Sequence, residues 1–484
     1  MKTIIKRWIR TLLANPMAIS AARKILRPFP SAEEEIRVWI YLLKKKLLHN
    51  GTTPLPVENI QPTPTTMPGG QKLLIDVSEL ALRDVHTGIQ RVVRSLLQEL
   101  LRHPPAGYAV EAVYVDVAGQ LRYASKFVNS VMGKPQIDLE EPPVPIHSGD
   151  LFFCPDLHLT YPFAMLAALK LQGLRIVFAI YDIIALNNPE LFPKALKLGF
   201  TDWFTGVMKV ADAVVCDSRA VVDELESWLD SHPGLRTRSL PIGYFHLGAD
   251  IESSQPTPGP GGEGAEVLAA CQSRPTLLMV GTLEPRKGHA QALAAVETLW
   301  KRDIDLNLVI IGKEGWRTQQ LARQLRRHPE RNRRLYWLNG ASDVLLLRLY
   351  ARASALLAAS YAEGFGLPLI EAARQGLPII ARDIPVFHEV AGDFAFYFPN
   401  TDSAALADSL RHWLQLHAEG KAPQSRDMPY LTWAQSTAQV STLISLGNWY
   451  RIWPTEADTS SADYNIQDSM TKLALTEPHR DFAS

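Results

Sequence analysis

The sequence predicts an α/β fold in which two Rossmann-like domains stand in tandem and face a central cleft. Its 484 residues exceed the size at which one hydrophobic core usually keeps growing, so two or more domains are expected. Short apolar runs alternate with longer helical patterns in both halves of the chain. A Pro- and Gly-rich interruption at 253–265 separates these halves and is the predicted interdomain linker.

The apolar runs have the length and composition of strands in a parallel sheet. In the first half they are Leu73–Val77, Val110–Val117, Leu151–Phe153, Ile176–Ile180 and Ala213–Cys216. In the second half they are Leu277–Val280, Leu308–Ile311, Leu335–Leu338, Leu356–Ala359, Pro378–Ala381 and Phe394–Phe398. Such strands usually lie in a sheet that helices cover on both faces. Ligands collect at the carboxyl ends of these strands, so the residues after each run are candidates for chemistry.

Composition divides the chain into seven segments. They are a basic amphipathic helical segment at 1–50, a Pro/Thr-rich linker at 51–70, a Rossmann-like domain at 71–252, the linker at 253–265, a second Rossmann-like domain at 266–430, a helical stretch at 431–452 and a polar tail at 453–484. A cleft between the two domains is therefore the natural place for a reaction.

Overall composition excludes several classes of protein. Hydrophobic residues make up 46% and charged residues 21%, which excludes a wholly disordered, collagenous or coiled-coil chain. Fifty basic and fifty acidic side chains give a formal net charge of zero, so no strong overall field gathers nucleic acid. No apolar run reaches the roughly 18 to 20 residues that a membrane-spanning helix needs. The three cysteines lie far apart without a Cys-x-x-Cys pair, so a reducing cytoplasm fits best.

Residues 1–50 carry a local positive charge, with eleven Lys and Arg against three Glu. Ile5, Trp8, Ile9 and Leu12 repeat at helical spacing, while basic residues line the other side. Such a helix either adsorbs to the anionic inner surface of the cytoplasmic membrane or packs on the body of the protein. Both interpretations stay open, so the expected location is the cytoplasm, with peripheral membrane attachment as one of two forms.

The segment Ser360–Glu371 carries the strongest chemical signal. Gly364 and Gly366 bracket a tight turn after a predicted strand, and Pro368 suits the first turn of a helix. The unpaired backbone N–H groups at the start of that helix form a ready site for phosphate oxygens. The segment therefore predicts an anion site at the carboxyl end of a strand.

Two glutamates flank this turn, Glu363 in the loop and Glu371 in the helix. Both would repel phosphate, but paired acceptors suit hydroxyl groups such as those of a sugar and a ribose. A favourable interaction with the helix dipole would account for Glu371 alone, and not for Glu363 or the glycines. The pair therefore predicts hydroxyl recognition beside the anion site.

A second element, Val280–Gly288, follows the first predicted strand of the second domain. Its Arg286 and Lys287 can place two positive charges beside a diphosphate. Negative charge grows on the terminal phosphate when a nucleoside diphosphate leaves, so fixed cations would stabilise that transition state without a metal. A solvated charged turn is the alternative, and the expected proximity of the Glu363 loop argues against it.

Three strings of the second half together resemble the nucleotide-sugar-binding domain of glycosyltransferase family 4, whose members are retaining enzymes of GT-B architecture. They are Gly281–Gly288, Gly340–Asp343 and the Glu-x7-Glu segment Glu363–Glu371. The resemblance implies that Arg286 and Lys287 grip the donor pyrophosphate. It further implies that Glu363 contacts the donor sugar and that Glu371 takes the ribose hydroxyls.

The same resemblance implies further donor contacts. They involve the loop at Gly281, the backbone of Phe365, Gly366 and Leu367 against the phosphate and sugar, and residues from Leu338 to Ser342 along the base. No cofactor and no metal are expected, because the nucleotide sugar is the substrate.

The first half resembles the same family. Asp84–Arg91 is similar to the family's glycine loop, in which Gly88 lets the main chain approach the donor sugar because it has no Cβ. Tyr181 and Asp182 stand where many members carry His-Asp, and Tyr is a poor base near neutral pH. Asp182 is either an acceptor-side carboxylate or only a strand-end capping residue. The stretch 431–452 is expected to return toward the first domain, as in this architecture.

The resemblance implies a metal-independent retaining hexosyltransferase that moves a sugar from a nucleoside diphosphate to a growing bacterial surface glycan, such as lipopolysaccharide. Asp76–Leu80, Thr87–Arg91 and Tyr244–Asp250 resemble bacterial surface-polysaccharide mannosyltransferases, so GDP-mannose is the expected donor. A glycan or lipid-linked glycan is the expected acceptor. The catalytic candidates are Arg286, Lys287, Glu363 and Asp182.

Two other functions compete with this one. The first is a sugar-nucleotide epimerase of the same fold, and the second is a non-catalytic membrane-associated scaffold that binds a glycan. The presence of Arg286, Lys287, Glu363 and Glu371 argues against the scaffold, because nothing in folding demands that set. Tyr181 in place of the usual histidine is its only support. No nucleic-acid partner is expected.

Overall fold

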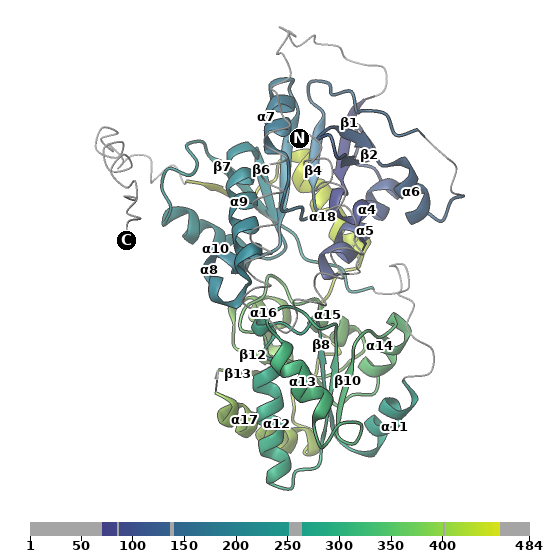
Figure 1. Ribbon diagram of the computed structural model, residues 1–484, viewed down its shortest axis with the longest axis vertical. Coiled ribbons are helices and arrows are strands. Elements are labelled where there is room, and N and C mark those ends of the chain that lie inside the picture. The colour runs from purple at the N-terminus through teal and green to yellow at the C-terminus, as the bar shows by residue number, and fades with distance from the viewer. Residues whose placement is uncertain (1–69, 85–86, 136–139, 251–263, 400–401, 455–484) are drawn as a thin grey trace, which may run out of the picture.

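The computed structural model describes residues 70–84, 87–135, 140–250, 264–399 and 402–454. Two α/β domains stand one above the other, and each is built around its own largely parallel sheet (Figure 1). The predicted basic segment at 1–50, nearly all of the linker at 51–70, most of the linker at 253–265 and most of the tail at 453–484 lie outside the described residues. Within these described ranges, no helix is both long and apolar enough to cross a membrane.

The first domain has an eight-stranded sheet in the order β14-β7-β6-β5-β4-β1-β2-β3. Its strands are β1 (Gln71–Asp76), β2 (Tyr108–Val115), β3 (Leu121–Tyr123), β4 (Leu151–Cys154), β5 (Arg175–Ile180), β6 (Ala213–Cys216), β7 (Leu240–Tyr244) and β14 (Arg451–Trp453). Its helices are α4 (Ser78–Leu82), α5 (Gly88–Arg102), α6 (Ser125–Val131), α7 (Phe163–Leu171), α8 (Ile184–Asn187), α9 (Lys194–Val210) and α10 (Arg219–Asp230). Only the edge strands β3 and β14 pair antiparallel within this sheet.

The second domain has a six-stranded sheet in the order β10-β9-β8-β11-β12-β13, and every described pair is parallel. Its strands are β8 (Thr276–Val280), β9 (Asn307–Ile311), β10 (Leu335–Leu338), β11 (Ala355–Ala358), β12 (Ile379–Arg382) and β13 (Ala395–Phe398). Its helices are α11 (Ala265–Ser273), α12 (His289–Lys301), α13 (Gln319–Arg327), α14 (Asp343–Tyr350), α15 (Leu367–Arg374), α16 (Pro385–Ala391) and α17 (Ser403–Ala418). In chain order this sheet reads 3-2-1-4-5-6, the Rossmann arrangement.

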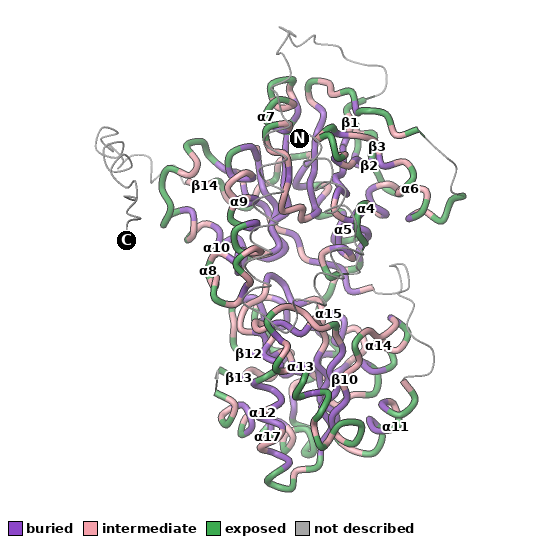
Figure 2. Tube along the Cα trace, in the orientation of Figure 1, coloured by how far each residue is buried: buried purple, intermediate pink, exposed green. Residues whose placement is uncertain are grey.

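Both sheets are buried on both faces, as the continuous apolar strands require (Figure 2). Every residue of β4, β6, β9 and β12 is buried. The predicted fold class, two Rossmann-like domains, is therefore confirmed, and all eleven predicted strands are present within a few residues of their expected bounds. Three strands were not predicted. β7 is interrupted in sequence by Pro241 and Gly243, and β3 and β14 have only three residues each.

Helix α5 illustrates why these residues form these elements. The Thr87 hydroxyl caps the first turn by accepting the Gln90 N–H, and the Gln90 side-chain oxygen in turn accepts the Thr87 N–H. Apolar residues recur at helical spacing, and the buried ones are Val92, Val93, Leu96, Leu97 and Leu100. This stripe packs the helix onto the first sheet, so the beginning of α5 lies at the carboxyl end of β1.

The chain returns to the first domain after the second sheet is complete. Helix α18 (Trp433–Leu446) packs against α5, and β14 pairs with β7. Two hydrogen bonds fix the crossing: the Ala249 N–H donates to the Leu431 carbonyl at 2.8 Å, and the Trp433 N–H donates to the Asp250 side-chain carboxylate at 2.6 Å. Two covalent connections thus link the domains.

A buried carboxylate joins the domains where α10 meets α16. Glu389 on α16 accepts the N–H groups of Arg219 and Ala220, each at 2.8 Å, at the first turn of α10. His246 Nε2 also hydrogen-bonds to Glu389 Oε1, at 2.7 Å. Burial raises the pKa of Glu389, but the bonds from His246 and the α10 backbone outweigh it and lower that pKa below its usual range. Glu389 therefore caps a helix of the opposite domain.

Removing this carboxylate is expected to weaken the interdomain contact. The Glu389→Ala variant leaves two N–H groups of α10 without their partner, so we expect the free energy of unfolding to fall by about 2 kcal/mol. Urea titration measures this change. The exposed Glu419→Ala variant, which loses only surface contacts with Lys421 and Gln415, is the control and should leave the free energy of unfolding essentially unchanged. Equal effects of the two substitutions would contradict the assignment.

Candidate functional site

A cleft of about 1420 Å³ lies between the carboxyl ends of the two sheets. Typical small-molecule pockets measure roughly 300 to 1,000 Å³, so this cleft has room for more than one substrate. The predicted site residues that line it are Gly88, Asp182, Gly281, Arg286, Lys287, Leu338, Glu363, Phe365, Gly366, Leu367 and Glu371. The two domains thus bring the predicted residues of both halves to one cavity.

Glycines shape the loop that carries the two cations. Gly281 follows β8 with φ of 140°, and Gly288 ends the 3₁₀ turn Pro285–Lys287 with φ of 71°. A Cβ on Gly288 would overlap the backbone oxygen of Ala359, so this position requires glycine on two counts. The close approach joins the loop after β8 to the loop after β11, because the Tyr361 N–H donates to the Arg286 carbonyl at 2.7 Å.

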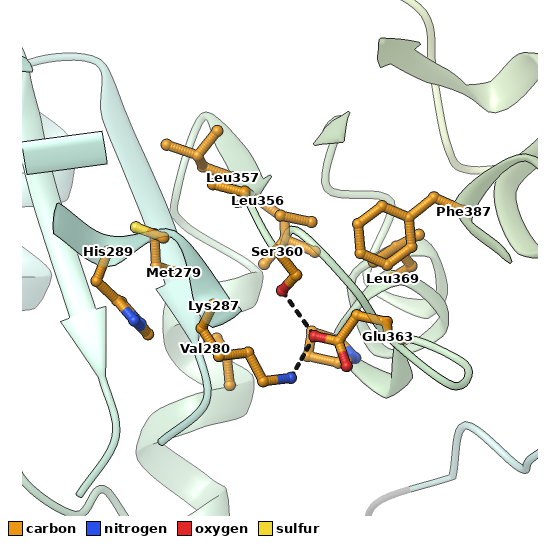
Figure 3. A pocket seen from close by; sticks show the side chains of 14 residues that line it. Met279, Val280, Lys287, His289, Leu356, Leu357, Ser360, Glu363, Leu369 and Phe387 are labelled. Atoms are coloured by element: carbon orange, nitrogen blue, oxygen red, sulfur yellow. Dashed lines mark hydrogen bonds and ion pairs between the residues drawn. The ribbon is translucent and has the colours of Figure 1, made fainter. Parts of the chain in front are cut away.

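Arg286 and Lys287 both bind the carboxylate of Glu363. Arg286 Nη1 donates to Glu363 Oε2 at 2.8 Å, and Lys287 Nζ donates to Glu363 Oε1. Ser360 Oγ donates to the same Oε1 at 2.6 Å, and Arg286 Nε donates to Glu284 at 2.8 Å. Figure 3 shows Lys287 and Ser360 converging on Glu363 from two loops. We define Arg286, Lys287, Glu363 and Ser360 as the cation cluster.

The electrostatics of the cation cluster follow from its burial. Burial raises the pKa of Glu363, but Lys287 and Arg286 outweigh it and lower that pKa to about 2. Burial, and then Arg286, lowers the pKa of Lys287 below its ordinary value. Burial lowers the pKa of Arg286, whereas Glu363 and Glu284 raise it, and the net shift is upward. The carboxylate therefore holds two like charges together.

A small cavity of about 20 Å³, enough for one water molecule, lies behind the cation cluster. His289, the first residue of α12, lines this cavity together with Lys287 and Met279 (Figure 3). Its Nδ1 atom is buried and has no hydrogen-bond partner among the residues that the structure describes. Burial, and then the charge of Lys287, lowers the pKa of His289 to about 3. The imidazole is therefore neutral behind the cations.

The glycine turn before α15 has the predicted form. Gly366 adopts φ of 100° and accepts the Leu369 N–H at 2.9 Å, and Pro368 lies in the first helical turn. A Cβ on Gly364 would overlap the Tyr181 carbonyl oxygen of the first domain. Ser218 Oγ donates to the Gly364 carbonyl at 2.7 Å. The turn that carries the predicted anion site is thus also part of the domain interface.

Glu371 lies one turn into α15 and has partners that the sequence did not reveal. Arg91 Nη1, from α5 of the first domain, donates to Glu371 Oε1 at 2.8 Å, and Arg91 Nη2 donates to Asp343 at 3.0 Å. Tyr350 OH donates to Glu371 Oε2 at 2.7 Å. Burial raises the pKa of Glu371, and Arg91 opposes that rise. Arg91 ends the string that marks the glycine loop, so its position near the cleft was predictable but its partners were not.

The remaining predicted residues have different environments. Ser342 does not line the cleft; its hydroxyl accepts the Leu345 N–H at 3.2 Å and caps α14, so the cleft is lined by the neighbouring Ala341 and Asp343. Leu338 ends β10 and lines the cleft. Gly88 begins α5 and faces Leu367. A Cβ atom on Gly88 would lie 3.9 Å from Leu367 Cδ1.

Tyr181 and Asp182 follow β5. Tyr181 OH donates to the Pro155 carbonyl at 2.7 Å, so the hydroxyl is engaged within its own domain. Asp182 Oδ1 accepts the Ile184 N–H at 3.1 Å, which is the capping contact, and the residue also lines the cleft. Burial raises the pKa of Asp182, and Arg286 opposes that rise. The two interpretations of Asp182 are therefore compatible.

Comparison with known proteins defines the class of fold. A solved sucrose-phosphate synthase from Thermosynechococcus elongatus superimposes with a TM-score of 0.53, covering 77% of this chain and 98% of that chain at 15% identity. The N-terminal domain of a Candida albicans trehalose-6-phosphate phosphatase superimposes with a TM-score of 0.50 at 13% identity. This match covers 79% of this chain and 95% of that chain. At these identities the likeness shows the fold alone, which is the predicted GT-B architecture.

Similar proteins are found by sequence. Residues 265–426 match the family model described as Glycosyl transferases group 1, so the second domain is similar to members of that family. A serotype-specific mannosyltransferase WbdA from Escherichia coli is 40% identical over 372 residues, which cover 76% of this chain and 44% of that protein. An O-antigen chain mannosyltransferase B from Escherichia coli is 32% identical over 139 residues, 28% of this chain and 36% of that protein. The matched part of this chain therefore covers less than half the length of each of these relatives.

The neutral His289 predicts an acid dependence of stability. Its folded pKa of about 3 lies below the ordinary 6.5, so the unfolded chain binds this proton first. The stabilising contribution is therefore complete above pH 6.5 and is lost as the pH falls toward 3. Relative to His289→Gln, the wild-type free energy of unfolding should fall by about 1.4 kcal/mol per pH unit over this interval. Urea titrations at several pH values measure it, and parallel curves would refute a buried neutral imidazole.

Proposed function

We propose that the protein is a retaining glycosyltransferase that moves a hexose from a nucleoside diphosphate to a glycan. The observation that carries the proposal is the cation cluster beside the turn at Gly366, at the wall of a cleft between two Rossmann-like domains. Two fixed cations and the backbone N–H groups before α15 suit the two phosphates of such a donor. The similarity of the second domain to group 1 glycosyl transferases supports the same reaction class.

The chemistry assigned to the cation cluster concerns the leaving group. The bond between the anomeric carbon and the phosphate oxygen breaks, and the acceptor oxygen bonds to that carbon on the same face. The acceptor's proton passes to the leaving phosphate oxygen, which balances the step without an enzyme nucleophile. Arg286 and Lys287 stabilise the negative charge that develops on the phosphate. Because two resident cations are already present, the reaction is proposed to need no metal.

The two glutamates are proposed to recognise hydroxyl groups of the donor. A phosphate that binds Arg286 and Lys287 would share these cations with Glu363. The carboxylate of Glu363 would then still accept hydrogen bonds from hydroxyl groups of the transferred sugar. Glu371 would accept the ribose hydroxyls next to the nucleotide phosphates. Arg91 faces both Glu371 and Asp343, and it reduces the negative charge that an anionic nucleotide would otherwise meet.

GDP-mannose is the proposed donor, and a growing O-antigen-type surface glycan is the proposed acceptor. The similarity to curated mannosyltransferases supports mannose as the sugar. Action in the cytoplasm, with attachment of residues 1–50 to the inner membrane surface, is part of the proposal. The epimerase and the scaffold are not favoured by these relatives. Incubation with GDP-mannose alone distinguishes the epimerase, which would form an epimer without acceptor.

Replacement of Lys287 tests the role of the cation cluster. We expect Lys287→Met to lower kcat by about a hundredfold or more, because one of two charges that stabilise the leaving diphosphate is lost. Release of GDP from GDP-mannose in the presence of acceptor measures it. Lys301→Met, at the exposed end of α12, is the matched control and should leave kcat unchanged. Unimpaired turnover by Lys287→Met would overturn the assigned chemistry.

Replacement of Glu371 tests donor recognition separately. We expect Glu371→Gln to reduce the thermal stabilisation by GDP, because stabilisation rises with the logarithm of ligand concentration over the dissociation constant. A tenfold weaker affinity removes about 1.4 kcal/mol at saturating ligand. Scans with GDP, UDP and dTDP, each at several concentrations, measure this and identify the base. An equal response of variant and wild type would remove Glu371 from the site.

A further inference from the structure

A carboxylate outside the predicted set lines the same cleft, and one of its two oxygens lacks a hydrogen-bond partner among the residues that the structure describes. Asp217 follows β6 directly and is 4% exposed. It is among the residues that line the cleft. Its Oδ1 atom is buried and has no hydrogen-bond partner among the described residues. Most buried polar side-chain atoms in proteins are hydrogen-bonded, so this orphan atom calls for a physical explanation.

The strand register places Asp217 beside the predicted acceptor-side residue. Ile180 of β5 pairs with Cys216 of β6, so the chain after each strand emerges at the same edge of the sheet. Asp182 and Asp217 therefore belong to one wall of the cleft, on the first domain. Ser218 Oγ, next to Asp217, donates to the Gly364 carbonyl. This wall thus adjoins the loop that carries Glu363, where donor and acceptor would meet.

Burial of the Asp217 carboxylate is unfavourable for folding. Burial raises the pKa of Asp217 well above its usual range, and the charges of Asp182, Glu389 and Glu363 raise it further. The group is therefore costly to bury, and no hydrogen bond to Oδ1 from the described residues offsets that cost. The adjacent Ser218 provides both local structural contacts, the cap to Val221 N–H at 3.1 Å and the bond to Gly364. A bound ligand is the partner that the cavity allows.

We propose that Asp217, together with Asp182, binds a hydroxyl group of the acceptor sugar. This proposal rests on the proposed function and names the acceptor's position within it. A carboxyl group pairs with a hydroxyl as donor or acceptor, whereas two neighbouring acids would repel a phosphate. A cationic ligand would be repelled by Arg286 and Lys287, which lie close enough to Asp182 to lower its pKa. A neutral, hydroxyl-rich sugar is the class of ligand that fits both conditions.

The isosteric variants Asp217→Leu and Asp217→Asn test the proposal in the full chain. Leucine has the shape of aspartate without its polar atoms, and asparagine keeps part of the hydrogen-bonding capacity. Transfer from GDP-mannose to octyl α-D-mannopyranoside is compared with hydrolysis of GDP-mannose without acceptor. We expect Asp217→Leu to raise the acceptor KM about ten- to a hundredfold, and Asp217→Asn to raise it less. The donor KM and the hydrolysis rate should stay within about twofold.

The unfolding temperature measured without ligand distinguishes a binding role of Asp217 from a structural one. Replacement of a structural residue would lower this temperature, whereas replacement of a binding residue with an unpaired oxygen should raise it. Because Asp217 Oδ1 is buried without a partner in the described part of the chain, Asp217→Leu should unfold at a temperature about 2 °C or more above the wild type. The control Asp150→Asn alters an equally buried acid at the opposite end of the sheet, which accepts the Lys72 and His147 N–H groups at 2.9 Å. This control should unfold at a lower temperature and keep its acceptor KM.

The outcomes separate the two proposals. A lower unfolding temperature for Asp217→Leu, or an unchanged acceptor KM, overturns the acceptor subsite while the proposed function stands. Equal losses for donor and acceptor overturn it as well, because they assign Asp217 to donor binding. If the wild type neither hydrolyses GDP-mannose nor transfers from it, the proposed function fails and the subsite fails with it.

Discussion

The site depends on one buried interaction, the attraction of the Glu363 carboxylate for the side chains of Arg286 and Lys287. Without this carboxylate, two adjacent cations would repel each other in a poorly solvated position. With it, both cations stay fixed at the carboxyl end of β8 and face the cleft. Their orientation is therefore set before any ligand arrives, which is the condition for electrostatic stabilisation of a developing charge.

The same loop couples the site to the domain arrangement. Residues 363–366 contact the cations of the second domain, and they also lie against the Tyr181 carbonyl and the Ser218 hydroxyl of the first. Arg91 adds ion pairs from the first domain to two acids of the second. Any movement that opens the cleft must therefore break contacts of residues that are proposed to bind the donor. The proposed donor binding would therefore be linked to movement of the domains through shared atoms.

The sequence predicted the fold well because buried parallel strands are read locally, from runs of apolar residues. It predicted that Gly366, Glu363 and Glu371 lie together after a strand, because their spacing in one loop and helix is also local, and all three line the cleft. Partners far apart along the chain could not be predicted: the contacts of Arg91 with Asp343 and Glu371 arise only when the domains meet. The string Gly340–Asp343 predicts that Ser342 lies along the nucleotide base. In the structure its hydroxyl instead accepts the Leu345 N–H and caps α14, which is an equally local interaction.

The distribution of buried charge divides the cleft into two chemically different parts. Arg286 and Lys287 provide the positive part, where negative charge can gather on a leaving group. Asp182 and Asp217, on the first domain, provide acids whose pKa values burial raises. Neither part is explained by the stability of the fold, because burying ions costs free energy and apolar residues of the same shape would avoid that cost. Both parts nevertheless face one cavity, so the charge pattern is better explained by a ligand with phosphates at one end and hydroxyl groups around it than by stability.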